Sequence, residues 1–124
     1  MFLNCFCFLF FVFFLFLGAY SSRTPHIHLM VHLGSGKTVH VTQIYFSDAM
    51  NNRVNRIMPY KKRAKNLASK NENDYIFRRD SGQNTIMKNV KPLDGRFVSK
   101  GLVGEMILGI NPDHASTHAL LNKE

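Results

Sequence analysis

The chain has 124 residues, the length of one domain, which excludes a multidomain protein. Its composition is 45% hydrophobic and 19% charged, which excludes a disordered or low-complexity chain. The net charge is +8, and all 16 basic and 8 acidic residues follow Ser22, whereas 8 of the 11 Phe lie in the first 16 residues. The chain therefore combines an apolar opening with a basic remainder.

Residues 1–22 form an almost wholly apolar segment without Lys, Arg, Asp or Glu. Gly18 and Ala19 are small residues near a cleavage point before Tyr20, so a signal peptide and secretion are expected. About 18 apolar residues also reach the minimum span of a bilayer, so an uncleaved membrane anchor is the alternative, and membrane contact is expected only then. A third interpretation is that this start does not belong to the natural protein.

A strand pattern begins at residue 26. Over residues 26–33, His and Met alternate with Ile, Leu and Val, so two sets of side chains face opposite ways. Residues 34–37 (GSGK) allow a tight turn, and a β-rich run resumes over residues 38–46. These features predict a β-hairpin.

A short helix is expected over residues 49–58, where apolar side chains recur at helical spacing. Ser47 or Asp48 can cap its start, and Pro59 ends it. Residues 53–70 contain seven basic residues and no acid. We interpret them as a solvated basic surface and expect no nucleic-acid partner, because a single tyrosine offers a stacking ring there.

Further short strands are expected to complete the domain. Asn73 and Asp74 indicate a turn before residues 75–77, and Asp94-Gly95 is a hairpin signal. The candidate strands are residues 84–90, 96–98 and 104–110.

The chain is thus divided into the apolar segment 1–22, a domain over residues 23–110 and a tail over residues 111–124. The expected fold class is mainly β, a partial β-sandwich with one short helix after the hairpin. His114 and His118 lie four residues apart in the tail and are expected to be solvated.

A His-x-His pair stands in the first predicted strand. Residues i and i+2 project from the same face of a strand, so His26 and His28 can present two imidazoles to one metal ion. His32 shares that face, but we expect it to be an ordinary solvent-facing strand residue. The pair by itself is also compatible with two partly exposed histidines that bind nothing.

The residues around this pair resemble a known enzyme family. Residues 23–28 (RTPHIH), followed one hairpin later by residues 42–46 (TQIYF), are similar in type and separation to the signature of the intradiol ring-cleavage dioxygenases. That family of non-haem ferric enzymes includes catechol and protocatechuate 3,4-dioxygenases. Residues 73–77 (NDYIF) also resemble members of one branch. The resemblance extends from Gly18 to about Ile110 and corresponds to the carboxy-terminal portion of such an enzyme.

The resemblance implies a site and a reaction. His26 and His28 would be the two histidine ligands of non-haem Fe(III), and Arg23 and Gln43 would lie beside the bound substrate as catalytic residues. The implied reaction cleaves a catechol-type aromatic diol with O2 to a muconate. A guanidinium offers a fork of donors suited to a catecholate or to negative charge that builds up during oxygen attack. Gln43 can orient Arg23 or a substrate oxygen.

The resemblance also implies two tyrosinate ligands, whose hard oxygen atoms stabilise ferric iron. One would fall at Phe16, which has no oxygen, and the other before residue 1. The chain is then either a truncated or wrongly started gene product or a degenerate homologue with an incomplete metal site. Both interpretations predict impaired catalysis.

A different function class stays open beside the enzyme. The alternative is a non-catalytic secreted β-sandwich binding module, in which the residual histidine pair would hold Zn or Cu more readily than iron. Missing strands would also leave sheet edges exposed unless a second chain covers them, so an oligomer is left open.

Overall fold

The structure is a computed structural model that describes residues 22–32, 34, 38–62 and 70–110. The apolar segment up to residue 21 and the tail over residues 111–124, with His114 and His118, lie outside the described residues. The interpretations of these two segments, and the domain boundaries, therefore stay predictions. Within the described ranges, no helix is long and apolar enough to cross a membrane.

The predicted hairpin is confirmed. Strand β1 (His26–His32) pairs antiparallel with β2 (Thr38–Tyr45), and the register places His26 opposite Tyr45 and His28 opposite Gln43. Directly opposed residues of an antiparallel pair project from the same face. The two histidines therefore share one face of the hairpin with Gln43 and Tyr45.

The opposite face of the hairpin is apolar. Ile27 lies opposite Ile44 in the register, and both are buried together with Phe46. The partly buried side chains that pack against this cluster are Leu29, Met87, Val90 and Met106. This apolar cluster thus packs on one face of the hairpin. The other face carries the two histidines and Gln43 together with the buried ring of Tyr45, which packs against Phe77.

The expected helix is present but shorter than the sequence suggests. Helix α1 (Asp48–Val54) begins where the Ser47 hydroxyl accepts a hydrogen bond of 3.2 Å from the backbone N–H of Met50. It ends at Val54 rather than at residue 58 because the next N–H groups, of Arg56 and Ile57, bond to carbonyls only three residues back. Such bonds tighten and terminate an α-helix.

The segment expected as a turn at Asn73 and Asp74 is the entrance of a helix. The structure has a single 3-10 turn η1 (Asn71–Asn73), helix α3 (Tyr75–Arg79) and a second 3-10 turn η2 (Gly82–Thr85) in succession. Asp74 caps α3 by accepting hydrogen bonds from the backbone N–H groups of Ile76 and Phe77. After η2, Ile86 bridges to Tyr45 at the end of β2.

The second sheet corrects three strand predictions. Strand β3 (Lys88–Pro92) pairs antiparallel with β4 (Leu102–Glu105), so the candidates at residues 84–90 and 104–110 are shifted. Residues 96–98 form no strand, because the Asp94 carboxylate accepts the N–H groups of Arg96 and Phe97 and bends the backbone into a turn. The 3-10 turn η3 (Val98–Lys100) follows.

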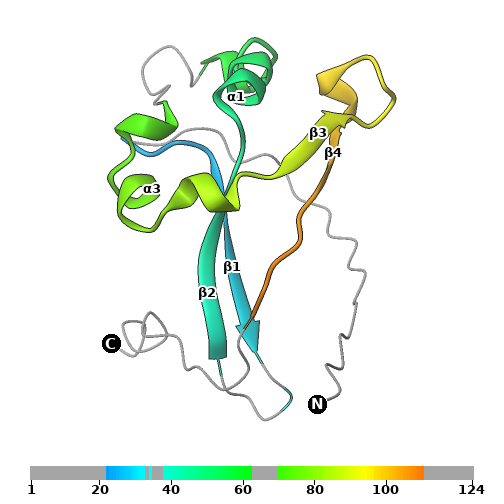
Figure 1. Cartoon of the computed structure of the whole chain (residues 1–124). Coiled ribbons are helices and arrows are strands. Elements are labelled where there is room, and N and C mark those ends of the chain that lie inside the picture. Colours follow the sequence, from blue (N-terminus) through cyan, green and yellow to red (C-terminus); the bar gives the residue numbers. More distant parts are fainter. Residues whose placement is uncertain (1–21, 33, 35–37, 63–69, 111–124) are drawn as a thin grey trace.

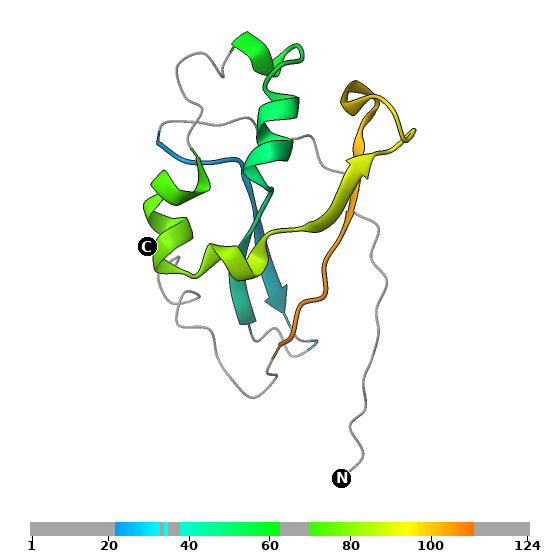
Figure 2. The same ribbon diagram turned by 45° about the horizontal axis from the view of Figure 1, so that its top comes forward.

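The described residues are therefore mainly β, with short helices and two small antiparallel sheets, as in part of a β-sandwich. In Figures 1 and 2 the helices α1 and α3 gather at the end of the first hairpin where β1 begins and β2 ends. His26 and Tyr45 stand at that same end. The β3–β4 hairpin extends to one side.

Replacing Gly82 with Ala should destabilise the fold by roughly 1–3 kcal/mol, the usual range for overpacking. A Cβ atom at Gly82 would overlap the buried ring of Phe77, which packs edge-on against Tyr45. Gly109→Ala is the matched control, since a Cβ there meets nothing within 4 Å. Urea denaturation measures both variants, and equal stability would show that the Phe77 ring moves aside without cost.

Candidate metal centre

The imidazoles of His26 and His28 converge on one point. Their Nε2 atoms are 3.2 Å apart, and the ring centroids are 5.1 Å apart with the planes tilted by 56°. Two nitrogens that each lie about 2.0–2.1 Å from one tetrahedral metal ion stand roughly 3.3 Å from each other. The observed separation therefore suits two ligands of a single ion.

A backbone carbonyl fixes the tautomer of His26. The Nδ1 atom of this ring lies 2.7 Å from the carbonyl oxygen of Thr24, which can only accept a hydrogen bond. The neutral ring therefore carries its proton on Nδ1 and a lone pair on Nε2, the atom that faces His28. This is the arrangement in which an outer hydrogen bond orients a metal-binding imidazole.

The surroundings of His26 favour its neutral form. Burial lowers the pKa of His26 and outweighs the raising effect of the Thr24 hydrogen bond. The charges of Arg23 and His28 lower this pKa further, and that of Asp74 raises it slightly. His26 is almost fully buried, whereas His28 is exposed to solvent. A metal ion or ligand would thus approach from the side of His28.

Arg23 is held beside this pair at two of its nitrogens. Its Nε atom donates to the carboxylate of Asp74 at 2.8 and 3.0 Å. Its Nη2 atom donates to the side-chain oxygen of Gln43. The hydroxyl of Tyr45 donates to the same Gln43 oxygen at 2.6 Å, so one amide links the arginine to the tyrosine.

Asp74 is fully buried and ionised. Burial by itself would raise the pKa of Asp74, but hydrogen bonds from Arg23, Thr24 and Phe77 outweigh it and hold the pKa below its ordinary value. The Thr24 N–H donates to this carboxylate at 3.0 Å. A buried carboxylate that accepts several hydrogen bonds is stable as the anion.

Tyr45 keeps its proton. Burial, together with the nearby charge of Asp74, raises the pKa of Tyr45 to about 12. Its ring centroid lies 5.8 Å from that of His26, and its hydroxyl is the donor to Gln43. Tyr45 therefore acts as a hydrogen-bond donor within this cluster and not as a phenolate.

Comparison with solved structures identifies the family, whereas no family model and no curated protein matches the chain. The solved structure of an intradiol ring-cleavage dioxygenase from Tetranychus urticae matches 83% of this chain with a TM-score of 0.72 and 35% sequence identity. A second dioxygenase crystal structure also matches 83% of the chain, with the same TM-score and identity. The chain belongs to the intradiol ring-cleavage dioxygenase family.

The chain spans about half of each of these dioxygenases, 48% of the first and 47% of the second. It corresponds to their carboxy-terminal portion. The family assignment made from the short segments at residues 23–28 and 42–46 is therefore confirmed, whereas the roles of individual residues in the reaction are matters for proposal.

The structure brings together all four site residues that the intradiol dioxygenase resemblance suggested. Arg23 contacts Gln43, and His26 contacts His28. Among the described residues, no group of three or more His, Cys, Asp or Glu could hold a metal ion. His32 is exposed and bonds through Nδ1 to the Thr38 hydroxyl at 2.9 Å, as expected for an ordinary strand histidine.

The contacts that Asp74 makes in this site are not predicted by the sequence analysis. Asp74 is interpreted there as a turn residue, and 51 positions separate it from Arg23. The signal that could have found it is the resemblance of residues 73–77 to the family, since the nearby basic residues Lys70 and Arg78 give a local pattern no reason to pair Asp74 with Arg23. Thr24, whose backbone connects Asp74 to His26, was likewise missed.

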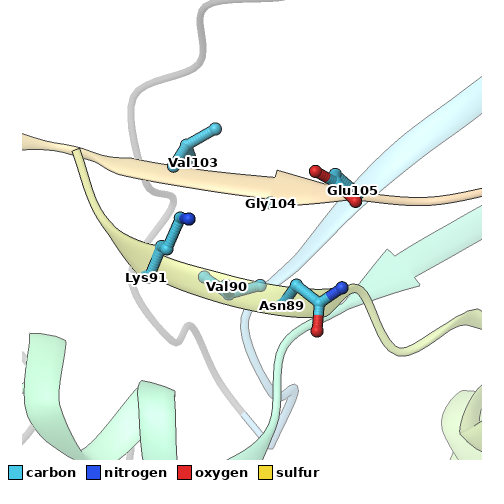
Figure 3. A pocket seen from close by; sticks show the side chains of 6 residues that line it. All are labelled: Asn89, Val90, Lys91, Val103, Gly104 and Glu105. Atoms are coloured by element: carbon cyan, nitrogen blue, oxygen red, sulfur yellow. The ribbon is translucent and has the colours of Figure 1, made fainter. Parts of the chain in front are cut away.

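A hollow elsewhere on the surface contains none of these residues. It has a volume of about 360 Å³ and lies between β3 and β4. Figure 3 shows Lys91 and Glu105 among the side chains at its border. Its border offers no pair of metal ligands.

Acidification should weaken the fold through Asp74. Its pKa in the folded protein lies below the ordinary 3.8 of an unfolded aspartate, so its contribution to stability is complete above that pH. The contribution is lost as the pH falls through the folded-state pKa, below 3.8. Stability against urea, measured from pH 6 downward, should therefore fall more steeply in the wild type than in Asp74→Asn. Parallel curves would contradict this assignment.

Proposed function

We propose that the chain is part of a non-haem Fe(III) intradiol dioxygenase. Its reaction would cleave a catechol-type aromatic diol with O2 and give a muconate. The observation that carries the proposal is the pair of Nε2 atoms 3.2 Å apart, next to an arginine fixed by Gln43 and Asp74. Membership of the family supports it. We also propose impaired turnover and secretion, on the sequence features given above.

The donor chemistry fits part of an iron site. Neutral imidazoles suit non-haem iron, and the fixed Nδ1 proton of His26 leaves its Nε2 available as a ligand. Tyr45 is held as a donor to Gln43, and no Asp, Glu or Cys among the described residues joins the histidine pair, so the proposal requires further anionic ligands. Bound Fe(III) would supply Lewis acidity, which favours the deprotonated form of a diol.

The side chains of this chain would bind and orient the diol. The guanidinium of Arg23, permanently charged, would face the negative charge of a catecholate and the charge that develops during oxygen attack. Gln43 would keep the guanidinium in place through its side-chain oxygen. The carbonyl of Thr24 would hold the proton of His26 on Nδ1 throughout.

Catechol-dependent oxygen uptake by the full chain after loading with Fe(III) tests the proposal. We expect slow uptake that His26→Ala abolishes, because that variant loses one of the two ligands. His32→Ala is the matched control, since this exposed histidine bonds to Thr38 and should leave uptake unchanged. Uptake that is absent from the wild type, or insensitive to His26→Ala, would refute the enzymatic proposal.

A second candidate function has its own supporting observation. The described residues hold only a two-histidine cluster without a carboxylate or thiolate ligand, which is better suited to Zn or Cu than to ferric iron. The protein would then be a non-catalytic secreted binding module. Zinc binding that requires both His26 and His28, combined with no oxygen uptake, would favour it.

A further inference from the structure

We infer that Asp74 is the positioning residue of this site: its carboxylate fixes both the guanidinium of Arg23 and the backbone that orients His26. The inference rests on the proposed function, in which Arg23 faces a bound catecholate. Asp74 comes from the entrance of α3, far along the chain from β1. Its hydrogen bonds go to Arg23, Thr24, Ile76 and Phe77, so it would position the histidine pair through its neighbours.

Two chains of contacts start at the Asp74 carboxylate. In the first, it accepts from the Nε atom of Arg23, whose Nη2 atom continues to Gln43. In the second, it accepts from the N–H of Thr24, whose carbonyl oxygen accepts from Nδ1 of His26. One carboxylate therefore sets the position of the charged group and of a metal-binding ring at once.

Asp74 is itself immobilised. It is 0% exposed, and the N–H groups of Ile76 and Phe77 donate to its Oδ1 atom at 2.9 and 3.2 Å. Phe77 is buried against Tyr45. The carboxylate is thus held in one orientation, and its hydrogen bonds fix the positions of Arg23 and Thr24.

Arginine needs such a partner to act as a fixed charge. Its long side chain otherwise samples many rotamers, and oxyanion stabilisation depends on donors that are already in place. In Arg23, engagement of Nε directs the end of the fork toward Gln43. The ion pair between Arg79 and Asp80 is the useful contrast, because it joins adjacent, more exposed residues at the far end of α3.

Binding of catechol to the Fe(III)-loaded full chain, followed by visible absorption, tests the inference. We expect Asp74→Asn to weaken catechol binding by about tenfold, the size expected for a lost charged hydrogen bond. Fe(III) affinity should fall as well, because the Thr24 backbone that orients His26 loses its charged acceptor. Asp80→Asn should alter neither. In an Arg23→Gln background, Asp74→Asn should cause a smaller loss of catechol binding than in the wild type, because only the contacts through Thr24 to His26 are then affected.

A purely structural role would give a different pattern. If Asp74→Asn lowers the melting temperature but leaves catechol affinity intact, or weakens binding equally with and without Arg23, the inference is overturned. The melting temperature alone therefore does not decide the matter.

A measurement on the metal-free protein separates this inference from the proposed function. The Nε–H signal of Arg23 in nitrogen-15 NMR should exchange slowly with water in the wild type and in Asp80→Asn, and rapidly in Asp74→Asn. Rapid exchange in the wild type would refute the positioning role even if Asp74→Asn does not fold. A wild type that shows the slow signal but binds no catechol would instead refute the proposed function alone.

Discussion

Asp74→Ala is expected to lower the free energy of unfolding by about 3–5 kcal/mol, the usual result of removing one partner of a buried ion pair. The variant leaves Arg23, whose side chain is only 16% exposed, without its carboxylate. It also removes the acceptor of three backbone N–H groups, those of Thr24, Ile76 and Phe77. Chemical denaturation measures the change.

Asp80→Ala is the control for this prediction. It removes the carboxylate of an ion pair whose two side chains are 45% and 35% exposed, and such surface pairs contribute little because water screens them. We expect no measurable change. If both variants lose the same free energy of unfolding, the buried ion pair between Arg23 and Asp74 does not stabilise the fold more than a surface pair does.

The second large effect concerns metal affinity. His26→Ala should weaken binding of Zn²⁺, a diamagnetic substitute for iron, by at least the roughly 10- to 100-fold that loss of an outer hydrogen-bond partner costs. The reason is that one of two converging Nε2 ligands disappears. Isothermal titration calorimetry gives the affinity.

His28→Ala should match His26→Ala, because both rings contribute one nitrogen to the same ion. His32→Ala should bind Zn²⁺ like the wild type, since its ring is exposed and bonded to Thr38. An effect of His32→Ala as large as that of His26→Ala would indicate non-specific binding by surface histidines and would refute the site.

The histidine pair could be predicted from sequence because its geometry is local. The period of two in a strand places residues 26 and 28 on one face, and the antiparallel pairing of β1 with β2 brings Gln43 opposite His28. Each step depends on neighbouring residues only. The segment at residues 23–28 therefore carried most of the information about the site.

The remainder of the site depends on contacts that no local pattern encodes. Asp74 reaches Arg23 across 51 residues, and a turn signal such as Asn73-Asp74 also fits a helix cap, which is what the structure has. The prediction of a strand over residues 104–110 is wrong in its bounds for a similar reason. Ladder partners on β3 decide where β4 lies, and they pair it over Leu102–Glu105.

The account depends most on His26 and His28 sharing one metal ion through their Nε2 atoms. Nitrogen-15 NMR of the full chain, titrated with one equivalent of Zn²⁺, tests this directly. We expect the Nε2 signals of both rings to shift together, while the Nδ1 atom of His26 keeps its proton for Thr24. A shift of one ring alone, or coordination through Nδ1 of His26, would contradict the account.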